Sequence, residues 1–177
     1  ILTEQIEKGR SELEYIDSVL DTVSRAESER ELAQIREELT EQGYLRKQKG
    51  KQRPQAALPP LEFTSSDGFK ILVGRNNTQN DKLTLKIANK NDMWLHTKDI
   101  HGSHTVVFAE GREISDTAIL EAAQLAAYYS KARESSQVPA DYTLVRYVSK
   151  PSGARPGMVI YVNNKTVYVT PKANISK

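Results

Sequence analysis

The first forty residues carry apolar side chains at helical spacing, in two segments separated by a break. In residues 1–24 the apolar positions recur at steps of three, four and seven, which predicts a helix. These positions are Leu2, Ile6, Leu13, Ile16, Leu20 and Val23. Leu32, Ile35 and Leu39 predict a second helix, and Gly43 is placed to end it.

The break between these helices carries helix-start signals. Ser24 and Ser28 each lie three residues before a glutamate, which is capping-box spacing. We interpret residues 1–45 as a helical arm like the end of a coiled coil or helical hairpin. Its apolar stripe is narrow, so we expect the arm to pack on another helix of a longer parent protein or on a second chain.

Residues 46–60 form a predicted linker that is first basic and then rich in proline. This composition is typical of an extended or mobile segment. We interpret its cations as a solvated tether, with an extra phosphate-contacting arm as the alternative. The cations are Arg46, Lys47, Lys49, Lys51 and Arg53.

Residues 61–177 combine short strand patterns with two helical patterns. Strands are predicted at 61–64, 69–74, 92–98, 104–109, 142–148, 158–162 and 166–170, and helices at 77–88 and 115–131. Turns at 65–68 and 163–165 are predicted to close hairpins. Strands grouped in this way with one or two packed helices indicate an α+β domain with a mixed, mainly antiparallel sheet.

The net charge changes sign near the end of the predicted helical arm. The net charge is +2 over 177 residues. Residues 1–42 hold 5 Lys/Arg against 12 Asp/Glu, a net −7, and residues 43–177 hold 20 against 11, a net +9. The basic part is suited to phosphates, which favours a nucleic-acid partner.

Two further features of the sequence exclude cysteine chemistry and a membrane-spanning segment. There is no cysteine, which excludes disulfides and thiolate catalysis and fits a cytoplasmic protein. No apolar run approaches the roughly 18 to 20 residues of a membrane span. Because the chain starts at Ile1 within a helical pattern, we interpret it as a fragment of a longer protein.

The most unusual segment runs from Asp92 to His104 and holds the only tryptophan and all three histidines. On a strand, Trp94, His96 and Lys98 point to one face, while Met93 and Leu95 point to the other. An indole, an imidazole and an ammonium in a row suit base stacking and phosphate contact. The periodicity leaves open whether this face meets RNA or whether Trp94 anchors the core.

Two catalytic readings of the same segment are weaker. Three imidazoles, at positions 96, 101 and 104, can hold zinc, but their spacing matches no compact motif. Ser103 follows a glycine but lacks the Gly-x-Ser-x-Gly context of a nucleophile elbow. We therefore expect neither a metal, a cofactor nor an enzyme activity.

Two other segments indicate phosphate contact. Gly74-Arg75-Asn76, with Asn80 nearby, places a glycine and a cation at a strand end, where backbone N–H groups can meet an anion. The loop from Lys150 to Gly157 is rich in turn residues and carries Lys150 and Arg155. The alternatives are an asparagine-capped connection and a solvated turn.

Six ordered motifs together resemble the NFACT family, over about residues 61–171. They are Gly74-Arg75-Asn76 with Gln79-Asn80-Asp81, Asp92-x-Trp94-x-His96-x-Lys98, Gly102-Ser103-His104, the alanine-rich 122–131 segment, Asp141-Tyr142-Thr143, and Lys150-x-x-Gly153-Ala154-x-Pro156-Gly157. The domain resembles the NFACT-R domain, and the arm resembles the end of the family's coiled coil. One departure is His101, where the family usually has proline, which weakens the metal reading further.

The resemblance implies an RNA-binding module that acts in ribosome quality control, with tRNA and the large ribosomal subunit as partners and alanine tailing of the nascent chain as its setting. It also implies an alternative, a fibronectin-binding adhesin at the cell surface without a signal peptide. The residues that we predict to contact RNA are Arg75, Asn76, Asn80, Trp94, His96, Lys98, Ser103, His104, Lys150 and Arg155.

Overall fold

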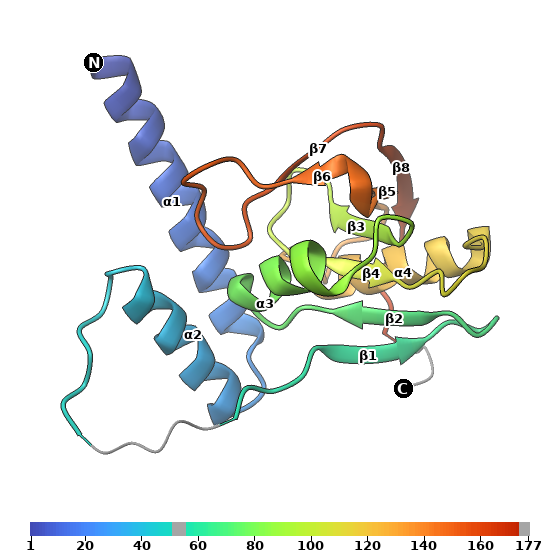
Figure 1. Cartoon of the computed structure of the whole chain (residues 1–177), viewed down its shortest axis with the longest axis horizontal. Coiled ribbons are helices and arrows are strands. Elements are labelled where there is room, and N and C mark those ends of the chain that lie inside the picture. Colours follow the sequence, from blue (N-terminus) through green and yellow to red (C-terminus); the bar gives the residue numbers. More distant parts are fainter. Residues whose placement is uncertain (51–55, 174–177) are drawn as a thin grey trace.

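The computed structural model describes residues 1–50 and 56–173 and consists of a two-helix arm against an α+β domain (Figure 1). The arm comprises α1 (Leu2–Arg25) and α2 (Glu29–Glu41). The Ser28 hydroxyl accepts the N–H of Glu31 at 3.2 Å, and the Glu31 carboxylate accepts the N–H of Glu27 at 2.8 Å. The predicted start of the second helix is therefore confirmed.

The domain is built on one six-stranded sheet in the order β1-β2-β4-β3-β5-β8, with every neighbouring pair antiparallel. A separate two-stranded sheet pairs β6 with β7. The fold class predicted from the sequence is confirmed. The strands are β1 (Leu61–Thr64), β2 (Lys70–Val73), β3 (Met93–Thr97), β4 (Thr105–Val107), β5 (Val138–Leu144), β6 (Val148–Ser149), β7 (Ile160–Tyr161) and β8 (Lys165–Val169).

The two faces of the large sheet are covered by different elements. Helix α4 (Asp116–Tyr128), capped by Ser115, packs its alanines closely on one face. The other face is covered by α3 (Asn77–Lys82), the π-helical turn η1 (Leu83–Ile87) and the β6–β7 pair. Both faces of the central strands are therefore buried.

The arm packs on the side of the domain that carries α3. Tyr15, Val19 and Ile35 form a small core with Met158 from the domain. The Tyr15 hydroxyl donates to the buried Glu38 carboxylate at 2.7 Å, and that carboxylate accepts the N–H of Thr78 at 2.7 Å. Part of the arm's apolar stripe is thus covered by this chain itself, although we expected a separate helix or chain.

Much of the apolar stripe of the arm stays exposed. No helix among the described residues is long and apolar enough to cross a membrane. The exposed apolar residues of the arm include Leu2, Ile6, Leu13 and Leu20. A further helix of a longer protein can cover them, as the sequence predicts.

The end of the predicted linker is held between arm and domain, whereas Lys51 and Arg53 lie outside the described residues. The Arg75 Nε donates to the Pro59 carbonyl at 2.7 Å, and Gln79 donates to the Leu58 carbonyl at 2.8 Å. Residues 58 and 59 therefore run as an ordered strap beside α3.

One predicted hairpin is wrong. Residues 163–165 turn with Asn163 at φ 55°, as expected, but β7 pairs with β6 and β8 pairs with β5. The turn therefore carries the chain from the small sheet to the edge of the large one. The predicted helix at 77–88 is also not uniform, because it changes from α to π geometry at Leu83.

Candidate nucleic-acid interface

Strand β3 has the alternation that its sequence predicts, but its Trp94 face is covered. Met93 and Leu95 pack in the core beneath α4, and Trp94 packs in the second core with Leu83 and Val106. The indole is 0% exposed. Trp94 is therefore a core anchor in this structure, which is one of the two alternatives that the strand periodicity left open, and its predicted contact with RNA is not available in this arrangement.

His104 lies beside Trp94 and is fully hydrogen-bonded as a neutral ring. Its Nδ1 is 2.8 Å from the Thr84 hydroxyl, and its Nε2 is 3.1 Å from the Gly157 carbonyl. A carbonyl can only accept, so we assign the proton to Nε2 and let the hydroxyl donate to Nδ1. Burial, with a smaller effect of nearby His96, lowers the pKa of His104 to about 3.

His96 stacks parallel to the Trp94 indole, with ring centroids 5.8 Å apart. Its Nδ1 is 2.7 Å from the Thr97 carbonyl and its Nε2 is 3.2 Å from the Gly102 carbonyl. A neutral ring can donate to only one of these. Burial lowers the pKa of His96, so the shorter bond to Thr97 is the one we assign to the neutral ring.

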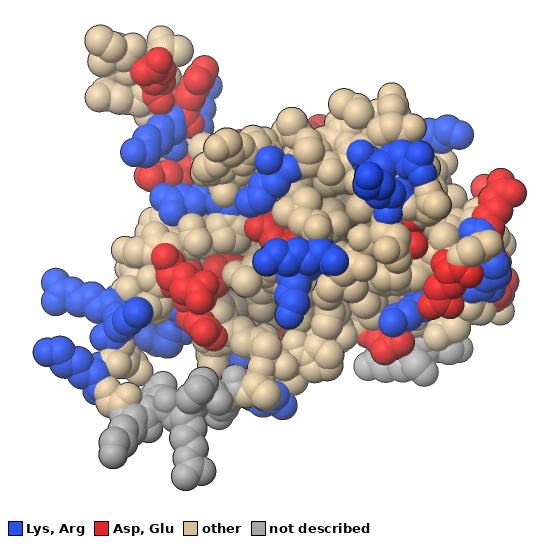
Figure 2. All heavy atoms as spheres, in the orientation of Figure 1, with Lys and Arg blue, Asp and Glu red and all other residues tan. Residues whose placement is uncertain are grey.

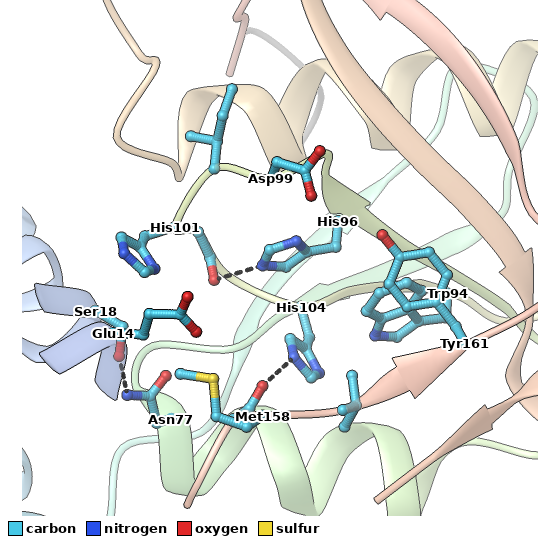
Figure 3. Close-up of a pocket in the computed structure, with 14 residues that line it drawn as sticks. Glu14, Ser18, Asn77, Trp94, His96, Asp99, His101, His104, Met158 and Tyr161 are labelled. Carbon is cyan, nitrogen blue, oxygen red and sulfur yellow. Dashed lines mark hydrogen bonds between the residues drawn. The ribbon is translucent and has the colours of Figure 1, made fainter. Parts of the chain in front are cut away.

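The three histidines line one cavity of about 370 Å³ between α1, the 99–104 segment and the 157–161 segment (Figure 3). Its wall combines flat rings with polar groups. Besides the histidines it is lined by Glu14, Ser18, Asn77, Trp94, Asp99, Ile100, Gly102, Gly157, Met158, Val159 and Tyr161.

The predicted phosphate clamp at Gly74 is engaged within the chain. The Arg75 guanidinium lies 2.5 Å from the Glu31 carboxylate of α2. Asn76 caps α3 by accepting the N–H of Gln79 at 2.8 Å. Asn80 is buried and accepts the N–H of His104 at 3.2 Å. In this arrangement these residues hold arm, strap and sheet together.

The cations of the 150–157 loop are paired in the same way. Lys150 Nζ lies 3.0 Å from the Asp81 carboxylate. The Arg155 guanidinium lies over the rings of Tyr15 and Tyr44 and 3.4 Å from the Glu12 carboxylate. The loop is therefore a docking point for the acidic arm.

The remaining predicted residues differ in exposure. Ser103 is buried, and the hydrogen bonds of the described residues join its hydroxyl to no histidine, so the nucleophile reading gains no support. Within the described ranges no three His, Cys, Asp or Glu side chains gather as metal ligands. Lys98 is exposed, as an RNA contact requires.

Exposed cations that we did not single out lie along α3, η1 and the turn after it. Lys82, Lys86 and Lys90 follow one another at four-residue steps and are all exposed. Arg146 joins them, since its Nε lies 3.4 Å from the Lys90 carbonyl. Figure 2 shows Lys and Arg gathered over α3 and over β6–β7, while carboxylates gather over α2. The four-residue spacing was visible in the sequence.

Comparison with known proteins gives the family of this chain. Residues 60–163 match the family model described as NFACT protein RNA binding domain. The chain belongs to the NFACT family. Residues 1–57 match the model described as NFACT N-terminal and middle domains, so the arm belongs to the family pattern as well.

Similar proteins of known sequence carry the name RqcH. Rqc2 homolog RqcH of Bacillus subtilis (strain 168) is 48% identical over 177 residues, which are 98% of this chain and 30% of that protein. Rqc2 homolog RqcH of Streptococcus suis (strain 05ZYH33) is 44% identical over 96% of this chain and 30% of its own length. The chain thus spans about 30% of the length of these NFACT relatives.

A solved structure is also close. It is the C-terminal part of the fibronectin/fibrinogen-binding protein from Streptococcus suis, with a TM-score of 0.93 and 40% identity, covering 99% of this chain and 72% of that one.

Proposed function

We propose that this part of the NFACT protein binds RNA through the exposed row of Lys82, Lys86, Lys90 and Arg146. The observation that carries the proposal is this row, on the side of the domain opposite α4, in a segment of the chain with net charge +9. Exposed cations release the counterions of a phosphate backbone when they bind it, which favours association at low salt. The family name for residues 60–163 gives the same partner class.

Within that class we propose tRNA and the RNA of the large ribosomal subunit as partners, in the cytoplasm. The whole protein would then act in ribosome quality control and support alanine tailing of stalled nascent chains. The proposal rests on the RqcH name of relatives that are 42–48% identical. It concerns a longer protein than the residues described here.

The test is RNA binding by the purified chain, with tRNA as the probe, measured by fluorescence anisotropy at low salt. Alanine at Lys86 and Lys90 should weaken binding several-fold, because each phosphate contact that is lost lowers the number of counterions that binding releases. The matched control replaces Lys8 and Arg10 of α1, which are also exposed and change the net charge equally. Equal affinities of the two double variants would refute this interface.

A second candidate function is fibronectin binding, favoured only by the name of the structurally similar streptococcal protein. No described residue identifies a fibronectin site. Titration of the purified chain onto immobilised fibronectin tests it, and saturable binding at micromolar concentration would support it. A flat response would remove this function from this part of the protein.

A further inference from the structure

The wall of the cavity beside Trp94 includes polar side chains without a partner in the part of the chain that the structure describes, and the two carboxylates among them belong to exposed residues. Among the described residues, the carboxylates of Glu14 and Asp99 and the imidazole of His101 make no hydrogen bond or ion pair. The Trp94 indole N–H, in the same wall, is buried and also lacks a partner. Figure 3 shows the Glu14 carboxylate directed from α1 into the space between His101 and His104.

The charge of this wall disfavours an anion. Across the described residues that line it there are two carboxylates and no lysine or arginine. His96 and His104 are held neutral, because burial lowers the pKa of each. A phosphate in the cavity would face Glu14 and Asp99 without a compensating cation.

The shape and chemistry of the wall fit a flat, neutral heterocycle instead. The volume, about 370 Å³, lies within the range of roughly 300 to 1,000 Å³ that is typical of small-ligand sites. Carboxylates accept from an exocyclic amine, and the imidazole of His101, whose ring makes no hydrogen bond with the described residues, can donate to a ring nitrogen. Adenine and cytosine present these two groups side by side, whereas uracil presents carbonyl oxygens that would face the carboxylates.

Two exposed lysines belong to segments that adjoin the wall of the cavity, and we assign them to the phosphates of a bound nucleotide. Lys98 is exposed and directly precedes Asp99. Lys131 is exposed, and its backbone N–H donates to the carbonyl of His101 at 2.8 Å. Single-stranded RNA is commonly bound in this way, with bases in ring-lined pockets and cations along the backbone.

We propose that the cavity between α1 and β3 receives one unpaired nucleobase that carries an exocyclic amine, with Glu14 and Asp99 accepting from the amine. This inference rests on the proposed RNA-binding function and names the part of the RNA that the cavity selects. It also gives the arm a direct role, because Glu14 belongs to α1 and completes a wall that the domain alone leaves open.

The test uses the whole chain and two uncharged probes, adenosine and uridine. Trp94 is the only tryptophan, so its fluorescence reports occupation of the cavity. Adenosine should change Trp94 emission saturably, and uridine should not. Glu14→Gln with Asp99→Asn should weaken adenosine binding about tenfold, since hydrogen bonds to charged acceptors are lost. Asp99 has φ 54°, a conformation that asparagine also adopts.

The control variant is Glu7→Gln with Asp17→Asn, which removes two exposed carboxylates of α1 and should leave adenosine binding unchanged. Single-stranded oligo(A) and oligo(U) then separate the two proposals. If neither binds at low salt, the RNA-binding function fails. If both bind equally and adenosine leaves Trp94 emission unchanged, RNA binding stands and the base pocket is overturned. Stronger oligo(A) binding by the Glu14 and Asp99 variant would also overturn it, because that is the response expected from charge alone.

Discussion

His104 makes the stability of the domain depend on pH in a direction that the structure fixes. The ring is buried and neutral, with its pKa lowered from 6.5 to about 3. The unfolded chain binds a proton at this residue near its ordinary pKa, whereas the folded chain does not until the pH falls to about 3. The contribution of the neutral His104 ring to the free energy of unfolding is therefore fully present above about pH 6.5, and it is lost as the pH falls from there towards 3.

The size of the effect follows from the two pKa values. At pH 5 the unfolded residue is almost fully protonated and the folded residue is almost fully neutral, which costs the folded state about 2 kcal/mol. At pH 4 the cost rises to about 3 kcal/mol, and at pH 7 it is close to zero.

The assay is the free energy of unfolding from urea titrations between pH 7 and pH 4, for the wild type and for His104→Gln. Glutamine can donate to the Gly157 carbonyl as His104 does, but it does not titrate. The variant will be less stable at pH 7, yet its stability should fall less steeply as the pH is lowered. Parallel pH dependences in the two proteins would refute the assignment of a buried neutral ring.

Two further perturbations test the packing around the candidate sites. Glu38→Ala should weaken the docking of the arm, because the Tyr15 hydroxyl and the Thr78 N–H would each lose their acceptor at a cost of about 1–3 kcal/mol. Amide hydrogen exchange in α1 and α2 should therefore be faster than in the control variant Glu37→Ala, which changes an exposed residue. Gly74→Ala should lower the melting temperature, because a Cβ there would lie 1.9 Å from Asn80 Oδ1. Gly9→Ala, in α1 with no atom of the described residues near the added Cβ, should instead raise the free energy of unfolding by about 0.5–1 kcal/mol. A stable Gly74→Ala protein, or an arm that exchanges normally without Glu38, would contradict these contacts.

Local patterns predicted most of the elements because their causes are local. Ser28 and Ser115 cap the helices that they precede, and β3 alternates between its two faces as a strand must. The family motifs were also readable, since they lie in order along the chain. None of these features depends on what lies beside the element in the folded chain.

The errors concern contacts between distant segments. Strand period cannot tell which face is covered, and Trp94 is buried because η1 and the β6–β7 pair, remote in sequence, close over it. Arg155 pairs with Glu12, 143 residues away, so its availability for phosphate depends on how the arm docks. The turn-rich loop from Lys150 to Gly157 led us to predict Arg155 as a phosphate contact, although the structure leaves Lys86 the more exposed.

The cavity beside Trp94 was not predicted, because it too depends on a contact between distant segments. Glu14 lies in the acidic arm, and only the docking of α1 brings it to the rings of β3, whereas Asp99 follows that strand directly along the chain. The sequence held all three histidines in one segment, which was the available signal.

The central claim is that exposed cations of the basic domain bind RNA through its phosphates, and the salt dependence of affinity tests it most directly. The affinity of the chain for tRNA should be measured by anisotropy across a series of salt concentrations. We predict that the logarithm of the association constant falls linearly with the logarithm of salt concentration, and that alanine at Lys86 and Lys90 reduces the slope by about 1 to 2. An affinity independent of salt, or a slope that these substitutions leave unchanged, would contradict the account.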